Sequence, residues 1–369
     1  MLHDFGGIVR RTPGTVIRPS CAREVAEAVR EAAASGTPLV ARGCGHSTGG
    51  QSQTGGVSLD LRGLATVHAV QADRVVVDAG ATWREVLDAT LPHGRTPPVL
   101  TDYLDLTVGG TLSAGGIGGT SHVHGTQAAN VLELDVVTRT GEAVTCSPGD
   151  RRDVFDAVRA AMGRNGVITR AALRLVPAPE RVLSFTVPLA GAAGLLRAQR
   201  TVRADHVSGL AEPGGRCELR AVVHDGDRPP PGLPPDETGT GMEVEELSFL
   251  DFADRMRPDV QELIALGEWA RPHPWATVLL PAARAVDVID ATLAEMGPDD
   301  IGLSGLVRIQ ALAPGPVPVP LLRAPADPVL FGLLRAASPG CRPVEEMLAS
   351  NRVLHDRARA AGGVLYMSS

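Results

Sequence analysis

The sequence predicts a protein of mixed α+β or α/β class, because two kinds of apolar spacing alternate along its first 180 residues. Residues 22–34 repeat apolar side chains at the spacing of one helix face, whereas residues 57–61 alternate them as a half-buried strand does. A capping box, Thr82-Trp-Arg-Glu85, indicates the start of another helix. Strands and helices are therefore expected within one stretch of chain.

Each further element follows from its own local signal. Ser20 can cap the helix at 22–34 and Gly36 can end it. We also expect strands at 74–78 and 167–176, helices at 82–91 and 153–162, and a hairpin of 131–138 with 141–146. Gly43 and Gly45 lack the third glycine of a Gly-x-Gly-x-x-Gly motif, which disfavours a Rossmann nucleotide site.

Proline-rich segments interrupt the second half of the chain at 228–235 and 313–328. Helical signals near 249–266 and 283–295 lie between them. We therefore interpret residues 180 to about 330 as a second domain.

Composition excludes several classes of partner. The net charge is −7 and the chain has no basic block, so no nucleic acid is expected as a partner. No apolar stretch reaches the roughly 18 residues that span a bilayer, so no membrane partner is expected. Because the N-terminus has no apolar signal segment, we expect a cytoplasmic protein. The five cysteines contain no Cys-x-x-Cys pair, which argues against disulfides or zinc, and we expect no metal.

A glycine-rich loop at 42–51, Arg-Gly-Cys-Gly-His-Ser-Thr-Gly-Gly-Gln, follows a short apolar run. Glycines let backbone N–H groups crowd around a phosphate, and His46 could reach the group that carries the phosphate. A plain strand-to-turn connection with an exposed histidine is the alternative.

A second glycine-rich segment covers 101–120 and interleaves its glycines with hydroxyl and apolar side chains. A flexible linker would not carry Leu104, Leu106, Val108, Leu112 and Ile117. The composition favours a buried loop against a large, flat, partly polar ligand, which bare backbone can approach closely.

Together these segments resemble those of the cytokinin dehydrogenases, FAD flavoproteins of the vanillyl-alcohol-oxidase type with a PCMH-type FAD-binding domain. The first segment carries Gly-His-Ser-x-x-Gly-Gln around His46, and the second carries Thr-Asp-Tyr-Leu-x-Leu-Thr-Val-Gly-Gly-Thr-Leu-Ser around Asp102. The likeness continues at 124–125, 130–138, 166–171, 250–252 and 272–275. It is good over 15–180 and patchy over 245–369.

The resemblance implies two domains of an α+β fold. Residues 1–178 would bind FAD, with a C-terminal return of about 335–369. Residues 179–334 would form a substrate domain of antiparallel sheet plus helices.

The resemblance also implies how FAD is held. His46 would be bonded covalently to the flavin 8α-methyl group. Some relatives add a second tether through a cysteine, but that position is Asp105 here, so we expect a single link. The other residues expected to bind FAD are Gly43, Cys44, Gly45, Ser47, Gln51, Asp102, Thr107, Ser113, Ile117 and Ile168. We expect Cys44 to be a small packing residue rather than a ligand.

Asp102 matches the catalytic base of the family. Amine oxidation needs a proton removed from N–H as hydride leaves the adjacent carbon, and a carboxylate whose pKa is raised by desolvation can accept that proton. The alternative for Asp102 is a helix or turn cap. Trp275 matches a substrate-pocket tryptophan, and a core aromatic is its alternative.

The sequence departs from the family in two places. The glutamate at the pocket mouth is either Glu218, or is replaced by Leu219, depending on a one-residue shift that turns a strand side chain to the other face. The family's aromatic-rich C-terminal helix and Pro-Gly-Gln segment are not found, so the sequence is either truncated or a shortened bacterial form.

The leading function is therefore an FAD-dependent oxidoreductase that takes hydride from a C–H bond next to an amine. As a cytokinin-type enzyme it would cleave the side chain of an N6-isoprenoid adenine, a small-molecule substrate, and pass electrons to a quinone or O2. A biosynthetic flavin oxidase acting on another amine or alcohol is the first alternative, and a flavin-binding protein without turnover is the second.

Overall fold

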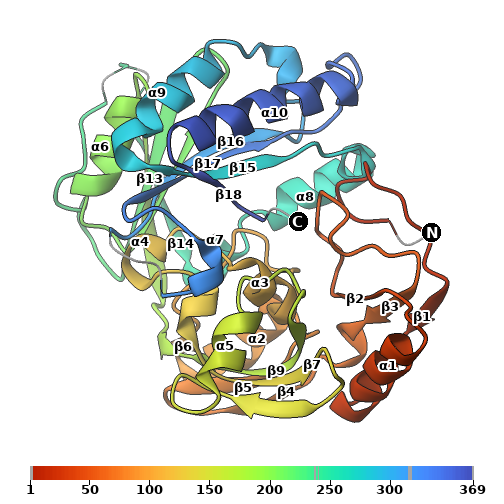
Figure 1. Ribbon diagram of the computed structural model, residues 1–369. Coiled ribbons are helices and arrows are strands. Elements are labelled where there is room, and N and C mark those ends of the chain that lie inside the picture. Colours follow the sequence, from red (N-terminus) through yellow and green to blue (C-terminus); the bar gives the residue numbers. More distant parts are fainter. Residues whose placement is uncertain (1–2, 237, 240, 315–317, 368–369) are drawn as a thin grey trace.

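The computed structural model describes residues 3–236, 238–239, 241–314 and 318–367. Figure 1 shows two parts, one formed by the first 180 residues and the other by a large sheet whose outer side is covered by helices. The strands form sheets of three, two, five and eight strands, and helices pack on them. The predicted α+β class is confirmed.

A small parallel sheet and one helix begin the first part. The sheet has the order β1 (Thr15–Ile17), β3 (Val57–Asp60), β2 (Leu39–Arg42), and both outer strands run parallel to β3. Helix α1 (Ala22–Ala34) has the predicted bounds, and its buried Val25 and Val29 pack with Leu59 of β3. The glycine-rich loop leaves the end of β2.

A five-stranded antiparallel sheet forms the floor of the first part, in the order β4–β5–β9–β7–β8. Its strands are β4 (Val67–Val70), β5 (Arg74–Asp78), β7 (Val131–Thr138), β8 (Ala143–Cys146) and β9 (Gly166–Arg174). The predicted hairpin is confirmed, because β7 pairs with β8. The helices of this part are α2 (Trp83–Thr90), α3 (Val108–Ala114), α4 (Ser121–His124) and α5 (Arg152–Val158).

Short elements complete this part. Strand β10 (Val176–Pro177) pairs with β6 (Arg95–Thr96). Turns of 3-10 helix lie at η1 (Leu61–Gly63), η2 (Leu91–His93) and η3 (Gln127–Asn130).

Two local predictions can be compared with the backbone. The capping box is confirmed, since the Thr82 hydroxyl accepts from the Glu85 N–H at 3.2 Å and the Glu85 carboxylate accepts from the Thr82 N–H at 2.7 Å. The predicted helix at 153–162 is too long, because α5 ends at Val158. Ala160 and Met162 have φ of 53° and 54°, in the left-handed region that a right-handed helix excludes.

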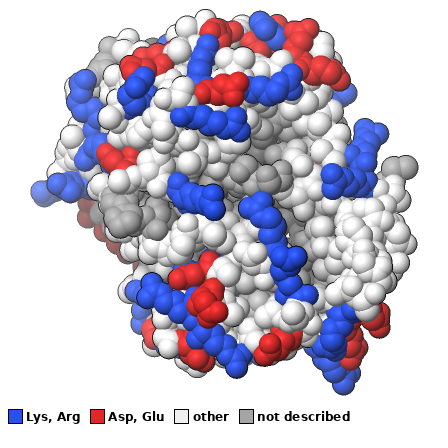
Figure 2. Space-filling view, in the orientation of Figure 1, with Lys and Arg blue, Asp and Glu red and all other residues white. Residues whose placement is uncertain are grey.

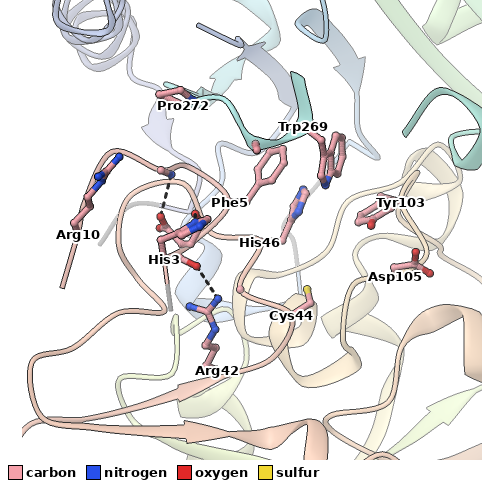
Figure 3. Close-up of a pocket in the computed structure, with 14 residues that line it drawn as sticks. His3, Phe5, Arg10, Arg42, Cys44, His46, Tyr103, Asp105, Trp269 and Pro272 are labelled. Atoms are coloured by element: carbon pink, nitrogen blue, oxygen red, sulfur yellow. Dashed lines mark hydrogen bonds between the residues drawn. The ribbon is translucent and has the colours of Figure 1, made fainter. Parts of the chain in front are cut away.

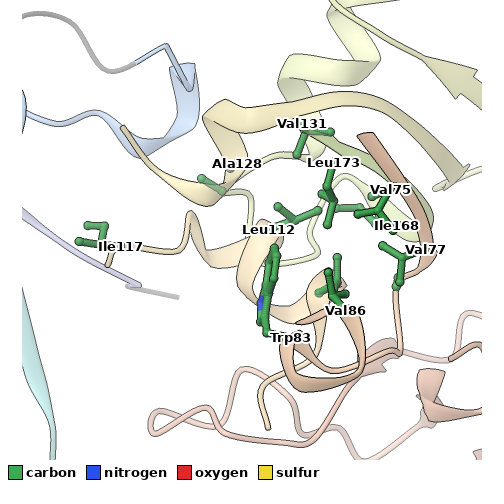
Figure 4. Close-up of a cluster of buried hydrophobic side chains, with 14 of the residues drawn as sticks. Val75, Val77, Trp83, Val86, Leu112, Ile117, Ala128, Val131, Ile168 and Leu173 are labelled. Carbon is green, nitrogen blue, oxygen red and sulfur yellow. The ribbon is translucent and has the colours of Figure 1, made fainter. Parts of the chain in front are cut away.

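The core between this sheet and its helices contains Trp83, which is 1% exposed. Its indole N–H donates to the Thr111 hydroxyl at 2.9 Å, so α2 and α3 are joined by a buried hydrogen bond as well as by apolar packing. Figure 4 shows Trp83 beside Leu112, whereas Ile117 lies apart from the other labelled side chains. Ile117, in the loop that follows α3, is nevertheless 4% exposed and belongs to the same buried cluster.

An eight-stranded antiparallel sheet forms the second part. Its order is β14–β11–β13–β12–β16–β17–β15–β18. The strands are β11 (Arg181–Leu189), β12 (His206–Ala211), β13 (Cys217–His224), β14 (Glu243–Ser248), β15 (Ala276–Pro281), β16 (Leu306–Ala311), β17 (Pro328–Leu334) and β18 (Val364–Leu365).

Three helices cover one face of the large sheet, namely α6 (Ala192–Thr201), α9 (Ala282–Leu293) and α10 (Val344–Ala360). Their side chains Leu195, Ile289 and Leu354 share one core with Leu219 of β13 and Phe331 of β17. Figure 1 shows these helices on the side away from the first part. The other face of the sheet is therefore turned toward the first part.

The remaining helices are α7 (Phe249–Ala253) and α8 (Arg257–Ala265), and further 3-10 turns lie at η4 (Glu268–Ala270), η5 (Pro298–Asp300) and η6 (Pro320–Leu322). Among the described residues, no helix has the length and apolarity that a membrane crossing requires.

The C-terminal residues contact both parts. Helix α10 packs on β15, and β18 pairs with β15 in the large sheet. Beyond β18, the Tyr366 hydroxyl accepts from the Gly116 N–H at 3.2 Å, and Gln51 donates to the Met367 carbonyl at 3.0 Å. The domain division at 178 and 334 stays a prediction. Of the segment of about 335–369 that the resemblance assigns to the FAD-binding domain, residues 344–365 lie on the large sheet.

Candidate active site

A cavity of about 440 Å³ lies between the uncovered face of the large sheet and the two glycine-rich segments. This volume is in the range of pockets that bind cofactors and small molecules, roughly 300–1,000 Å³. Every residue that the sequence singles out lines the cavity: Gly43, Cys44, Gly45, His46, Ser47, Gln51, Asp102, Thr107, Ser113, Ile117, Ile168, Glu218 and Trp275. Their individual roles stay predictions.

Two glycines of the glycine-rich loop lie too close to neighbouring side chains to carry a Cβ atom. A Cβ atom at Gly43 would overlap the Oγ1 of Thr107, and one at Gly45 would overlap the guanidinium of Arg42. Gly45 also has a φ of +77°, which favours glycine. Both glycines are required by close approach, and they present bare backbone to the cavity.

Asp4, which the sequence analysis did not single out, holds this loop from the N-terminal side. It is 0% exposed, and its carboxylate accepts from the Gly50 N–H at 2.8 Å and from the Ser47 hydroxyl at 3.1 Å. The N-terminal segment is thereby tied to the loop. Because Asp4 and Ser47 are 43 positions apart, no local pattern indicates this contact.

His46 belongs to a cluster of rings. The Phe5 ring is stacked on His46 at 4.0 Å and on His273 at 3.8 Å, and so lies between the two imidazoles. Trp275 meets His46 edge-on at 5.7 Å. Figure 3 shows the His46 ring among Phe5, Trp269 and Tyr103. Both tyrosines of the chain and two of its three tryptophans line the cavity.

The environment of His46 favours a neutral imidazole. Burial, together with the nearby His273, lowers the pKa of His46 to about 3. A neutral ring keeps an unprotonated nitrogen with a free lone pair, which a nucleophile or a ligand needs. His46 is thus suited to forming a bond rather than to carrying charge.

A second cavity of about 390 Å³ adjoins the first and shares Phe5, His46 and Tyr103 with it. Figure 3 shows Asp105 at its border. Asp105 accepts from Arg84 at 3.2 Å, so a charged side chain occupies the position where some relatives carry a second tether. Cys44 also borders both cavities and is exposed, and its expected role as a small packing residue stays a prediction.

Asp102 is held by two arginines. Arg255 pairs with one carboxylate oxygen, and the Nη1 of Arg308 lies 3.0 Å from the other. Burial acts to raise the pKa of Asp102, but Arg308 and Arg255 outweigh it and hold the pKa below its ordinary value. The expected rise in this pKa is therefore wrong, because the site is dry but not free of opposite charge.

The large sheet turns Glu218, and not Leu219, toward the cavity. Leu219 is 0% exposed in the core beneath the helices, whereas Glu218 and Arg220 line the cavity. Glu218 of β13 is paired with Leu210 of β12, and Leu210 is paired in turn with Arg308 of β16. These three side chains form one row on the same face. Burial raises the pKa of Glu218 above its ordinary value.

Trp275 also faces the cavity, just before β15. Its indole N–H is buried and has no hydrogen-bond partner among the described residues. A buried donor without a partner is costly unless a ligand accepts from it. This favours the predicted contact with a bound molecule over a core position.

Several side chains of the cavity were not predicted from the sequence: Phe5, Tyr103, Arg220, Arg255, Trp269, Arg308 and Tyr366. A signal existed for two of them. Arg220 and Arg308 are charged residues inside strands whose other positions are mostly apolar, and a charge at a strand position commonly marks the open face.

The cavity fits a long, flat cofactor with a phosphate-bearing part. Bare backbone at Gly43, Gly45 and Gly110 can approach an anion, and Ser47, Thr107 and Ser113 add hydroxyl groups. Ile117, Val167 and Ile168 offer an apolar wall for a ring system. The unpartnered donor of Trp275 adds a polar anchor. The residues present therefore suit FAD.

Comparisons with known proteins agree with this geometry. Residues 13–147 match the family described as FAD binding domain. This range contains α1, the glycine-rich loop, Asp102 and α3.

Several relatives are similar over most of this chain. An uncharacterized oxidoreductase, ORF5 in the fasciation locus of Rhodococcoides fascians, is 38% identical over 98% of this chain and 86% of its own length. Cytokinin dehydrogenase 8 of Oryza sativa subsp. indica is 32% identical over 98% of this chain and 80% of its own. Cytokinin dehydrogenase 7 of Oryza sativa subsp. japonica is 36% identical over 77% of this chain, which spans 65% of that relative.

The matched FAD-binding family and these relatives cover both the loop side and the sheet side of the cavity. The chain belongs to the cytokinin dehydrogenase family of FAD-dependent oxidoreductases.

Proposed function

We propose that this protein oxidises the side chain of an N6-isoprenoid adenine, with FAD bonded to His46 and Asp102 as the base. The observation that carries the proposal is that His46, Asp102, Glu218 and Trp275 line one cavity although they come from both parts of the chain. The relatives named cytokinin dehydrogenase support the same substrate class.

Bound FAD would accept the hydride from the carbon next to the N6 amine. Asp102 would accept the proton from the N6–H, which requires its carboxylate to be ionised. Arg255 and Arg308 favour that ionised form. The resulting imine would be hydrolysed to adenine and an aldehyde, and the electrons would pass to a quinone or O2.

Two other side chains would position the substrate. Glu218 lies on the face of the sheet that borders the cavity, where its carboxyl group could accept from the adenine N–H groups. Trp275 would offer an aromatic face and its unpartnered indole N–H.

The covalent link is tested on the purified protein. After denaturation in acid and gel electrophoresis, we expect flavin fluorescence on the protein band, and we expect it to be absent from His46→Ala. A yellow supernatant and a dark band from the wild type would contradict the link but leave FAD binding intact.

The reaction is tested with N6-isopentenyladenine. Added without oxygen, it should bleach the flavin, and with a dye acceptor it should be turned over. Asp102→Asn, with the same flavin content, should lower kcat by about 100-fold or more. Turnover of other amines or alcohols without any turnover of isopentenyladenine would favour a different oxidase reaction in the same site.

A further inference from the structure

The side chains that line the cavity carry more positive than negative charge. Arg220 and Arg308 lie on strands of the large sheet, and Arg255 follows α7. Among the described residues that line the cavity, the carboxylates are Asp102 and Glu218, and Glu243 lies in the row of Arg220 on the edge strand β14. Burial and the neighbouring Arg255 lower the pKa of His206. This imidazole is therefore neutral and does not change the balance of charge. Figure 2 shows that basic side chains also border the hollow between the two parts.

The three arginines differ in how fully they are paired. Arg255 is well satisfied: it pairs with Asp102, donates to the Phe252 carbonyl at 2.9 Å and covers the Phe252 ring at 4.6 Å. This arginine therefore has little capacity left for a ligand.

Arg308 and Arg220 keep free donors. Arg308 donates to Gln310 at 2.6 Å and pairs with Asp102 at 3.0 Å, but its buried Nε has no partner among the described residues. For Arg220, the described residues supply only Glu218, at 3.9 Å, which is too far for a hydrogen bond. Burial also raises the pKa of Glu218, so its carboxyl group is ionised less readily than that of Asp102 and is a weaker partner for an arginine.

The two arginines lie close together on the sheet. Arg308 is level with Glu218, since both are paired with Leu210 of β12, and Arg220 is two residues beyond Glu218 on the same face. Gly332 of β17 is paired with Arg308 and adds no side chain next to it. Both guanidinium groups therefore line the same part of the cavity.

We infer that the molecule oxidised in this site carries an anionic group, a phosphate monoester or a carboxylate, which Arg308 and Arg220 bind on the face of the large sheet. This inference rests on the proposed function, because it assigns the substrate class of the same site. A guanidinium binds either anion through two parallel hydrogen bonds, and such pairs are stronger where water is excluded. A neutral adenine derivative would leave Arg220 without a hydrogen-bond partner among the described residues.

The experiment compares three substrates with the flavin-loaded enzyme. N6-isopentenyladenosine is neutral, its 5′-monophosphate carries a phosphate, and 9-carboxymethyl-N6-isopentenyladenine carries a carboxylate. We expect at least one anionic compound to have a kcat/KM about 10- to 100-fold above that of the nucleoside, the size expected for hydrogen bonds to a charged group. The better of the two identifies the anion, and its advantage should shrink as salt is raised.

Variants test whether these arginines carry the preference. In Arg308→Leu and in Arg220→Leu, the ratio between anionic and neutral substrates should fall toward 1, whereas Arg308→Lys should keep part of it. Arg197→Leu is the matched control, because it removes the same charge from the exposed surface of α6, on the other face of the sheet. Arg220→Leu remains informative if Arg308→Leu fails to fold.

Two results would overturn the inference while the proposed function stands. One is a wild-type ratio of 1 or less for both anions, and the other is a preference that Arg308→Leu and Arg220→Leu leave unchanged.

If no adenine derivative is oxidised, the proposed function fails and the anion site is tested by itself. Inorganic phosphate and acetate are then added to the flavin-loaded enzyme, and the melting temperature is measured. Stabilisation that Arg308→Leu and Arg220→Leu abolish, but Arg197→Leu retains, would support the anion site. No stabilisation of the wild type would overturn it.

Discussion

The ring of Phe5 is stacked on the imidazole of His46, with their centroids 4.0 Å apart and their planes 20° from parallel. The same phenyl ring contacts His273 from its other side. One N-terminal side chain thus joins the glycine-rich loop to the segment before β15, and it shields the histidine that we expect to hold the flavin.

Replacing Phe5 with leucine should raise the pKa of His46 from about 3 toward its ordinary value, because burial is the main cause of the low pKa. The lost ring contacts should also lower the free energy of unfolding by about 1 kcal/mol. The pKa is measured by NMR titration of the flavin-free protein. Phe331→Leu, in the core of the second part, should destabilise the protein without moving this pKa.

Gly43→Ala should lower the free energy of unfolding by about 1–3 kcal/mol, because the new Cβ would overlap Thr107. The loop should also bind flavin less completely, which the ratio of flavin to protein absorbance measures. Gly55→Ala is the control, since Gly55 is exposed and has no atom within 4 Å of an added Cβ. Equal stability of the two variants would argue against the close approach at Gly43.

Arg308→Leu should move the acid limit of activity to higher pH. Arg308 helps hold the pKa of Asp102 low, so its removal raises that pKa, and Asp102 must be ionised to accept a proton. The check is kcat/KM of N6-isopentenyladenine, a substrate without an anion, against pH. An unchanged acid limb would mean that Asp102 does not limit proton transfer.

Substitutions at Glu218 and at Leu219 should have opposite effects on KM and on the free energy of unfolding. Glu218→Gln should raise KM and leave stability within about 0.5 kcal/mol, because this side chain faces the cavity. Leu219→Ala should lower the free energy of unfolding by about 2–5 kcal/mol, because this side chain is fully buried, and KM should stay the same. The reverse pattern would place the strand one residue out of register.

Trp83 and Thr111 should be energetically coupled. Thr111→Val leaves the buried indole N–H without an acceptor and should cost about 1–3 kcal/mol. In a Trp83→Phe background that N–H is gone, so the same change should cost less than half as much. Urea unfolding of the four proteins of this cycle gives the coupling, and additive costs would mean that the hydrogen bond contributes little.

Local signals predicted much of the first part. Helix α1, the capping box of α2 and the β7–β8 hairpin all depend on residues within a few positions of one another. The early end of α5 was missed, because the positive φ of Ala160 and Met162 is set by the surrounding structure. The sequence around Ala160 and Met162 carries no signal of a left-handed backbone conformation.

The site was predicted where a continuous segment carries it, as in 42–51 and 101–120. It was not predicted where distant segments meet, because Phe5 and His273 are 268 positions apart, and Arg308 of the large sheet contacts Asp102 of a loop in the first part. Glu218 and Leu219 could not be separated by sequence, since a one-residue shift reverses a strand face. Pairing with Leu210 defines that face.

Because tryptophans lie both at the cavity and in the core of the first part, the fluorescence of the protein reports on flavin binding and on folding. Trp269 and Trp275 border the space that a flavin would fill, so energy transfer to the flavin would dim their emission. Trp83 lies in the core of the first part and responds to unfolding of that core. Flavin occupancy and folding could therefore be followed in a single fluorescence measurement, without an added dye.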